Sequence, residues 1–291
     1  MKKKPKKSPK NKLKKLLRIF LALLMLFAVY SHFENTVIEA TKYTVRSERL
    51  PSSFDGYRIV QVSDLHSADF GNAHNGLINK IKACKPDIIV VTGDLCAKDD
   101  DDEIDSAVSF MKKAVKVAPV YYVTGNHEAV LDKYMILMAR IEALGVTILN
   151  DDEVTLTVGG ESIKLLGVCD PSFDGLPKEK NKSVMREKLD KLSPVGDSYT
   201  VLLSHRPELL SVYSEYNIDL VFSGHAHGGQ IRIPFVGGLY APNQGVFPKY
   251  TSGVHKMNGT TMVISRGIGS SSFPFRINNN PELICVTLKK A

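Results

Sequence analysis

Closely spaced cysteine pairs are absent from this chain of 291 residues. Its four cysteines, Cys84, Cys96, Cys169 and Cys285, are far apart, and none belongs to a CxxC motif. The sequence therefore lacks the thiolate ligands of a structural zinc site and the framework of a small disulfide-rich protein. We expect mostly buried free thiols. A disulfide between two of them stays open, because it depends on distances that the sequence does not give.

Basic residues are not spread along the chain as a nucleic-acid-binding surface requires. The formal net charge is +7, but residues 1–18 hold ten basic side chains and no acidic one. The rest of the chain holds 28 Lys and Arg against 31 Asp and Glu. Phosphate contacts need clustered Lys and Arg, so we expect no nucleic-acid-binding surface on the folded part. The chain also lacks internal repeats, and one globular domain is the simplest expectation.

A hydrophobic run follows the basic residues. Residues 1–18 form a basic tail, and residues 19–33 are uncharged and mainly apolar, a pattern shared by signal peptides and membrane anchors. We expect an uncleaved transmembrane anchor, although fifteen residues are fewer than the roughly 20 that span a bilayer comfortably. The positive-inside rule then keeps the tail in the cytoplasm. It places the remaining chain outside the cell membrane, as the extracytoplasmic domain of a single-pass protein.

Two alternatives stay open for this segment. Cleavage near Val29-Tyr30-Ser31 would release a secreted protein. An amphipathic or disordered basic tail on a cytoplasmic protein fits less well, because the apolar run is continuous. The chain lacks a twin arginine, so nothing indicates export in the folded state.

Residues 34–56 are expected to form a linker and a first strand, and residues 57–291 one α/β domain. Buried strand patterns alternate with amphipathic helices, as is typical of this class. Strands are expected at 58–62, 88–91, 120–123, 154–158, 163–168, 200–203, 219–222, 261–264 and 283–288. Helices are expected at 74–84, 103–117, 131–144, 178–192 and 207–216.

Polar clusters follow five of the expected strands, at the point where each strand ends. They contain Asp, His and Asn, which are side chains that bind metal ions. In open α/β sheets, binding sites form at the carboxyl ends of the strands. The clusters are Ser63-Asp64-Leu65-His66, Gly93-Asp94, Gly125-Asn126-His127-Glu128, Ser204-His205 and Gly224-His225-Ala226-His227.

In this order, the clusters resemble the motifs of the calcineurin-like metallophosphoesterase superfamily: Asp-x-His, Gly-Asp, Gly-Asn-His-Glu/Asp, His and Gly-His-x-His. The resemblance extends from about residue 57 to the C-terminus. The sequence Gly-His-Ala-His-Gly-Gly-Gln, the hydrophobic N-terminus and the late Arg276 and Pro281-Glu282 look like the bacterial membrane-anchored phosphodiesterase branch. The resemblance implies two packed mixed β-sheets flanked by helices, a four-layer α/β/β/α sandwich, preceded by an N-terminal hydrophobic helix.

The resemblance also implies two divalent metal ions. One would be bound by Asp64, His66, Asp94 and His227, and the other by Asp94, Asn126, His205 and His225. Asp94 is the bridge, which agrees with the ability of a carboxylate to bind two cations. Mixed oxygen and nitrogen ligands suit Mn²⁺, Fe or Zn²⁺ better than Ca²⁺.

The implied activity is that of a metal-dependent phosphoric ester hydrolase. Two metal ions lower the pKa of a bridging water, so that hydroxide attacks phosphorus in line. His127 would stabilise the transition state or protonate the leaving oxygen, with Asp94 as the shared catalytic ligand. The expected substrate is a phosphodiester or pyrophosphate, and the branch points to a lipid-linked one such as UDP-2,3-diacylglucosamine. Alternatives are a phosphomonoesterase or phosphoprotein phosphatase, and a non-catalytic membrane-tethered metal-binding scaffold.

Other residues have weaker assignments. Arg266 and Arg276 are candidates for substrate binding, with loop salt bridges as the alternative. Glu128 is expected to orient His127 or to cap the next helix. Gly228-Gly229-Gln230 is expected to form a wall of the substrate cleft, because backbone approaches a ligand most closely at glycine. The histidines His74 and His255 are expected at the surface, and the acidic residues 99–103 in a solvated loop.

Overall fold

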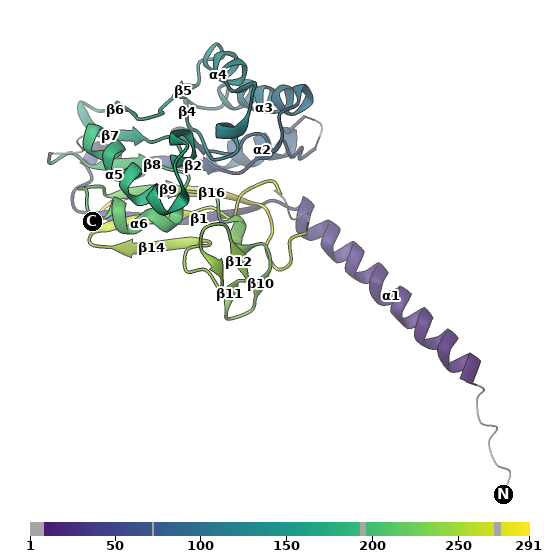
Figure 1. Ribbon diagram of the computed structural model, residues 1–291. Helices are drawn as coiled ribbons and strands as arrows, with labels where there is room; N and C mark the ends of the chain where they lie inside the picture. The colour runs from purple at the N-terminus through teal and green to yellow at the C-terminus, as the bar shows by residue number, and fades with distance from the viewer. Residues whose placement is uncertain (1–8, 72, 193–195, 271–274) are drawn as a thin grey trace, which may run out of the picture.

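Two six-stranded sheets form the centre of the protein (Figure 1). The computed structural model describes residues 9–71, 73–192, 196–270 and 275–291. The first sheet has the order β1-β16-β2-β3-β4-β5, and the second has the order β14-β15-β9-β8-β7-β6. Both sheets are mixed, because β16 is antiparallel to β2 in the first and β6 is antiparallel to β7 in the second.

The strands of the two sheets have the following bounds. The first sheet contains β1 (Glu39–Ser47), β16 (Glu282–Lys290), β2 (Arg58–Val62), β3 (Ile88–Thr92), β4 (Val120–Val123) and β5 (Thr147–Ile148). The second contains β14 (Gly253–Met257), β15 (Thr260–Ile264), β9 (Leu220–Ser223), β8 (Thr200–Leu203), β7 (Glu161–Gly167) and β6 (Asp152–Val158). Two small hairpins stand apart from them: β10 (Arg232–Ile233) with β11 (Gly237–Gly238), and β12 (Tyr240–Ala241) with β13 (Gly245–Val246).

The helices are α1 (Pro9–Thr36), α2 (Asn75–Cys84), α3 (Asp101–Ala114), α4 (Tyr134–Glu142), α5 (Asn181–Leu192) and α6 (Leu210–Tyr213). Short 3₁₀ turns occupy Ser52–Phe54, Glu128–Val130, Pro171–Asp174, Lys178–Lys180, Pro207–Leu209 and His227–Gly229. Asp100 caps α3 by accepting a hydrogen bond from the Glu103 amide, so part of the acidic run begins a helix.

Alternation along the buried strands produces the four layers. In β3, Ile89 and Val91 pack with the α2, α3 and α4 helices, whereas Val90 lies between the sheets. In β8, Leu203 also lies between the sheets, and Leu202 packs with α5 and α6 on the far side. Successive residues of a strand point to opposite faces, so apolar residues at consecutive positions bury both faces of each sheet. The expected α/β/β/α sandwich is therefore confirmed.

Residues 9–36 form one helix of 28 residues, which joins part of the expected basic tail to the expected span. The α1 helix runs from Pro9 to Thr36 and projects from the domain (Figure 1). Its part from Lys12 to Thr36 is long and apolar enough to cross a membrane, and 6% of its most apolar window is buried by the rest of the chain. The following strand β1 pairs with β16 along its whole length. The first strand expected within residues 34–56 is thus present as β1 of the first sheet.

Strand positions agree closely with the sequence pattern, and the missed elements are exposed ones. The strands β2, β4 and β8 have the expected bounds. The β14 strand was not expected, because its residues alternate between half-buried and exposed without a continuous apolar run. The expected helix at 207–216 is a 3₁₀ turn followed by the single-turn α6.

A disulfide joins α2 to β16. Cys84, at the end of α2, is bonded to Cys285, which is 201 residues later in the chain. The disulfide that the sequence left open is therefore formed by these two cysteines, and Cys96 and Cys169 are buried free thiols. The bond fastens the outer helix layer to the strand that carries the C-terminus.

The disulfide predicts a thiol count and a stability effect. In denaturant without reductant, two thiols should react with a thiol reagent, and four should react after reduction. The double variant Cys84→Ala/Cys285→Ala should lose about 2–5 kcal/mol of unfolding free energy in urea titrations, because the unfolded chain is no longer constrained. Reduced wild-type protein is the matched control and should resemble the variant. Four reactive thiols before reduction would contradict the bond.

Candidate metal centre

The five polar clusters meet where strands of both sheets end. Backbone hydrogen bonds hold the loops together: the Asp64 amide donates to the Gly93 carbonyl over 3.0 Å, and the His66 amide donates to the Asp94 carbonyl over 3.0 Å. The Gly224 amide likewise donates to the His205 carbonyl over 3.1 Å. The loops after β2 and β3 are thus fixed to each other, as are those after β8 and β9.

Left-handed backbone is frequent in the loops that carry these side chains. Non-glycine residues rarely have positive φ, and each instance costs on the order of 1–3 kcal/mol. Five of the seven expected ligands have this conformation, so the surrounding structure stabilises an unfavourable backbone at the site. They are Asp64 (52°), His66 (45°), Asp94 (56°), His225 (65°) and His227 (45°).

Glycines precede three of the clusters because no side chain fits there. A Cβ on Gly125 would overlap the Asp94 carboxylate, and one on Gly224 would overlap Ser63 and Asp64. A Cβ on Gly93 would lie 2.7 Å from His205 Nδ1. These glycines, rather than those after His227, let backbone approach the expected ligands closely.

Asp64, His66 and His227 form one group of atoms with the spacing of metal ligands. Their ligand atoms lie within 4.8 Å of one another, and all three residues are buried. His66 Nε2 lies 3.1 Å from His227 Nε2, which in turn lies 3.4 Å from Asp64 Oδ1. The Asp64 carboxylate also accepts the His225 amide at 3.0 Å, which fixes its orientation.

Asp94, His205 and His225 form a second group of the same kind. His205 Nε2 lies 3.2 Å from Asp94 Oδ2 and 3.2 Å from His225 Nδ1. The other ring nitrogen of His205 contacts the Thr92 carbonyl at 2.7 Å, which leaves Nε2 for a ligand. Asp94 Oδ2 is also 3.8 Å from His66 Nε2. This carboxylate therefore lies between the two groups.

The side chains present fit a pair of cations. Asn126, in the loop after β4, has a buried side-chain oxygen. This Oδ1 atom has no hydrogen-bond partner among the described residues. A buried amide oxygen without a partner is costly unless something binds it. Carboxylate, amide and imidazole donors at this spacing match the mixed oxygen and nitrogen sets that bind transition metals.

Burial and the two carboxylates set the charges of the site. Burial lowers the pKa of His66 to about 4 and holds the pKa values of His225 and His227 well below their usual value. Burial also acts to lower the pKa of His205, but Asp94 outweighs it and raises the pKa to about 10. Three imidazoles are therefore neutral at pH 7, which is the form that binds metal.

Glu128 holds two of the loops in place. Its buried carboxylate accepts the amides of Asp94 at 2.9 Å, Leu95 at 2.7 Å and Gly125 at 2.7 Å. Among the described residues, its side chain has no hydrogen bond to the His127 ring or to the start of α4, so the expectation that it orients His127 or caps the helix is wrong. Burial raises its pKa to about 7. Glu128 fixes the loop after β3 against the loop after β4.

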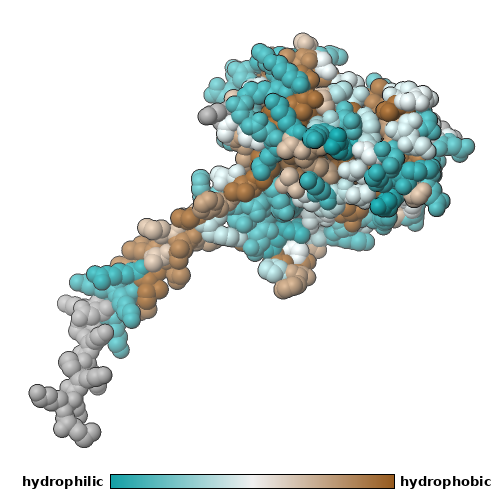
Figure 2. All heavy atoms as spheres, turned by 180° about the vertical axis from the view of Figure 1, so that it is seen from behind, coloured by the Kyte–Doolittle hydropathy of each residue, from teal (hydrophilic) through white to brown (hydrophobic). Residues whose placement is uncertain are grey.

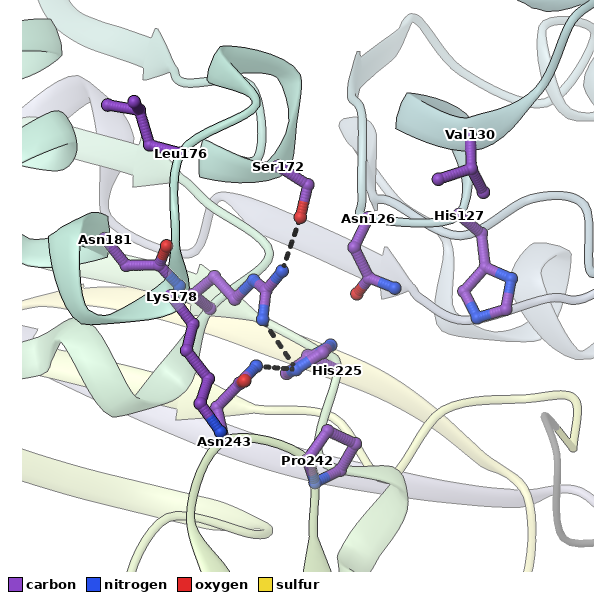
Figure 3. A pocket seen from close by; sticks show the side chains of 11 residues that line it. Asn126, His127, Val130, Ser172, Leu176, Lys178, Asn181, His225, Pro242 and Asn243 are labelled. Carbon is purple, nitrogen blue, oxygen red and sulfur yellow. Dashed lines mark hydrogen bonds between the residues drawn. The ribbon is translucent and has the colours of Figure 1, made fainter.

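His127 lies beside the two groups and faces a cavity (Figure 3). Its ring centroid is 4.7 Å from that of His66, and its Nδ1 is 3.3 Å from the Ala97 carbonyl. Its amide donates to Asp94 Oδ1 at 2.9 Å, so its backbone position depends on the central carboxylate. The ring is half-buried, in contrast to the fully enclosed histidine and aspartate ligands expected beside it.

The cavity has a volume of about 410 Å³ and opens onto His225. Five regions of the chain line it: the loop after β4, the segment before and at the start of α5, the loops after β8 and β9, and the turn between β12 and β13. In Figure 3, the Asn243 amide points at His225, and its nitrogen lies 3.0 Å from His225 Nε2. The lining residues are Asn126, His127, Val130, Ser172, Leu176, Lys178, Asn181, Arg206, His225, Pro242 and Asn243.

Arg206 is a cavity residue that the sequence motifs do not single out. Its guanidinium forms a two-pronged ion pair with Asp170, at 2.5 and 2.8 Å, and Nη1 lies 3.1 Å from His225 Nε2. The residue is buried, and it also donates to the Ser172 hydroxyl in the cavity. A usable signal exists in the sequence, since Arg206 directly follows His205 at the end of β8.

Arg266 and Arg276 have structural partners. Arg266 is paired with Glu39 at 2.6 Å and Glu282 at 3.2 Å, and neither arginine lines the cavity. Arg276 is fully buried and donates to backbone carbonyls, including that of Gly269 at 2.5 Å. These contacts support the alternative of structural roles over substrate binding.

Two further expectations, those for Gly228-Gly229-Gln230 and for His74, are corrected. Gly228 packs against Asn279, and Gly229 against Gly238, so this stretch is not a wall of the cavity. His74 is buried, and its Nε2 lies 3.0 Å from the Ser106 carbonyl oxygen. His255 is half-buried on β14 and contacts the Ser252 carbonyl at 3.0 Å.

The three hydrogen bonds of Glu128 predict a loss of stability when this residue is replaced. Glu128→Ala would leave three buried amides without acceptors, so the unfolding free energy should fall by at least about 3 kcal/mol. Glu128→Gln keeps an acceptor oxygen and should lose less. Urea titration measures both, and the exposed Glu142→Ala serves as control. An alanine variant that unfolds at the wild-type midpoint would contradict this role.

Comparisons with known proteins agree with the geometry. The family described as calcineurin-like phosphoesterase matches residues 57–229. The metallophosphoesterase YkuE of Bacillus subtilis is 30% identical over 262 residues, which are 89% of this chain and 88% of that protein. The phosphodiesterase YaeI of Escherichia coli is 26% identical over 238 residues, 80% of this chain and 82% of its own.

Two further matches concern the anchor and the fold. A transmembrane protein with a metallophosphoesterase domain from Bos taurus is 28% identical over 271 residues, covering 86% of this chain and 57% of that protein. The crystal structure of TT1561 from Thermus thermophilus aligns with a TM-score of 0.50 at 15% identity. That alignment covers 73% of this chain and 90% of the other.

Proposed function

We propose, since this chain belongs to the calcineurin-like phosphoesterase family of metal-dependent hydrolases, that it hydrolyses a phosphodiester or pyrophosphate in the cavity beside His127 and His225. One observation carries this proposal: the Asp94 carboxylate lies between two groups of metal-capable side chains, and the second group opens onto the cavity. Hydrolysis of a phosphate ester needs positive charge next to the reacting phosphorus. Divalent ions bound by these two groups would supply that charge beside the cavity.

The residues divide between two cation sites. Asp64, His66 and His227 would hold one divalent ion, and His205, His225 and Asn126 the other, with Asp94 shared. The donor set favours Mn²⁺, Fe or Zn²⁺. Bound divalent ions supply Lewis-acid charge to the phosphoryl group and lower the pKa of water.

The cavity residues receive the substrate. His127 is the half-buried histidine nearest the cation groups, so it is placed to hold a proton for the leaving oxygen. Arg206 and Lys178 supply positive charge to the phosphate, and the Asp170 ion pair holds the Arg206 guanidinium in a fixed orientation.

The size and lining of the cavity favour a diester over a monoester. A volume of about 410 Å³ is in the range of sites for small organic molecules. Val130 and Leu176 add apolar surface beyond the polar centre, where a second ester group would fit. The name of the relative YaeI, a phosphodiesterase, points the same way.

The α1 helix is proposed to anchor the domain outside the cytoplasm. The lysine-rich tail before it favours an inner position for the N-terminus. The Cys84–Cys285 disulfide favours an oxidising compartment for the domain. This sidedness argues against a nucleotide-lipid made in the cytoplasm, so UDP-2,3-diacylglucosamine is a weaker proposal than another phosphodiester at the membrane.

Replacing a shared or cavity-side ligand should abolish hydrolysis. Asp94→Ala and His225→Ala should each lose metal and more than about 100-fold in hydrolysis of bis(p-nitrophenyl) phosphate, since even outer partners of metal ligands cost 10–100-fold. Metal content is measured by mass spectrometry on protein loaded with Mn²⁺. His255→Ala, which removes a histidine outside the site, is the matched control.

Different outcomes separate the rival functions. Bound metal without turnover of diesters, monoesters or lipid pyrophosphates would favour a scaffold. Faster turnover of monoesters than of diesters would favour a phosphatase. Retained diester turnover by either purified variant would contradict the ligand assignment.

Arg206→Lys tests the role of the fixed guanidinium. Lysine keeps the positive charge but cannot form the two-pronged pair with Asp170. We expect kcat/KM to fall by about 10–100-fold. This decrease corresponds to about 1.4–2.7 kcal/mol of lost transition-state stabilisation, which is typical of one preorganised charged contact. Arg186→Lys, on an exposed pair with Glu215, is the control. Equal kinetics for the two variants would show that Arg206 is structural only.

A further inference from the structure

The two small hairpins expose a cluster of apolar side chains. Phe235 is fully exposed, and Phe247 is 60% exposed. Isolated apolar residues on a surface are ordinary, but a contiguous group within one short segment marks an interaction site. The exposed apolar residues of this segment, called the hairpin lobe (residues 231–247), are Ile233, Phe235, Val236, Tyr240, Val246 and Phe247.

Both phenylalanines of the hairpin lobe have left-handed backbone. The φ of Phe235 is 66° and that of Phe247 is 52°. Glycine or asparagine is the usual residue in this conformation, and a bulky side chain there is an outlier. The backbone at these two residues is therefore conformationally unfavourable, although both aromatic rings are exposed. Packing within the domain does not explain this arrangement.

The charges along the sequence of the hairpin lobe and its flanks are one-sided. The sequence has no Asp or Glu between Asp219 and Glu282, whereas Arg232 and Lys249 lie within or beside the lobe. An anionic surface would therefore meet attraction and no carboxylate repulsion from this part of the chain. Aromatic and apolar residues next to Lys and Arg are the composition of segments that lie in a membrane interface.

Hydrogen bonds fasten the hairpin lobe to α1. The Tyr30 hydroxyl donates to Asn278 Oδ1 at 2.9 Å, and the Asn278 side-chain amide donates to the Arg232 carbonyl at 3.2 Å. The Asn279 backbone amide donates to the Glu34 carboxylate at 2.8 Å. The last turns of α1 are thus connected to β10 through a single intervening segment.

Phe275 extends this connection along the helix. It shares a groove with Leu24, Phe27 and Ala28 of α1, within the apolar part of the helix. A residue of the domain therefore lies beside the segment proposed to enter the membrane.

The figures place the lobe on the side of the domain from which α1 leaves. In Figure 1, β10, β11 and β12 lie on the α1 side, whereas α4 is at the opposite end. Figure 2 shows hydrophobic atoms protruding at this side of the domain. A bilayer crossed by α1 would face the lobe and not α4.

We infer that the hairpin lobe is a membrane-binding surface whose aromatic side chains enter the interface of the same bilayer that α1 crosses. This inference rests on the proposed anchoring by α1. A lipid surface fits better than a protein partner, because the lobe is continuous with the anchor and the charges along its sequence are all basic. The lobe also contributes Pro242 and Asn243 to the cavity, so lipid contact places the cavity next to the bilayer.

A single tryptophan tests the contact. The chain contains no tryptophan, so Phe235→Trp gives one reporter without further changes. The full chain is placed in nanodiscs of phosphatidylcholine and phosphatidylglycerol in equal amounts, with or without bromine on the acyl chains. Brominated lipid should quench Trp fluorescence at this position at least about twofold. The control Ile136→Trp, at an exposed site on α4, should be unaffected.

The outcomes separate the lobe from the anchor. A chain that enters the nanodiscs but shows equal fluorescence from both variants, with and without bromine, overturns the lobe contact and leaves anchoring intact. A chain that does not enter the discs overturns both. Fluorescence at position 235 that responds to a second copy per disc, and not to bromine, assigns the lobe to self-association instead.

Discussion

The burial of Asp94 between two groups of histidines is the constraint on which the rest of the site depends. A carboxylate removed from water is costly unless hydrogen bonds or cations compensate it. The His127 amide supplies one such bond, and His205 Nε2 lies 3.2 Å from Asp94 Oδ2. Both contacts come from loops that follow other strands, so the carboxylate position is set by the meeting of the two sheets and not by its own loop.

Glu128 extends this constraint one layer outward. Its three backbone bonds fasten the loop that carries Asp94 to the loop that carries Asn126. Gly125 lets its loop pack directly against the Asp94 carboxylate, and Gly224 lets its loop pack against the Asp64 carboxylate. A side chain at either position would displace that carboxylate. Strained backbone at five expected ligands is therefore maintained by rigid neighbours, which is how strain persists at functional sites.

Sequence patterns predicted the features that depend on local order. Strands such as β2 and β8 are short apolar runs, and each polar cluster is directly adjacent to one, so both their existence and their common edge follow from the chain alone. The disulfide, the partners of Glu128 and the position of Arg206 depend on distances between segments far apart in the chain. Periodicity does not contain those distances, and for that reason the prediction for Glu128 was wrong and the pairing of Cys285 stayed open.

The connection between β9 and β14 shows how site and surroundings are joined. Residues 224–252 form a link far longer than the few residues that usually join strands, and such links are commonly functional. Its start provides two expected ligands, and its middle provides Asn243 against His225. The same middle section exposes Phe235 and Phe247. This middle section therefore forms part of the cavity wall and also the exposed apolar surface. A contact that fixes the position of the apolar surface would also fix the position of the cavity opening.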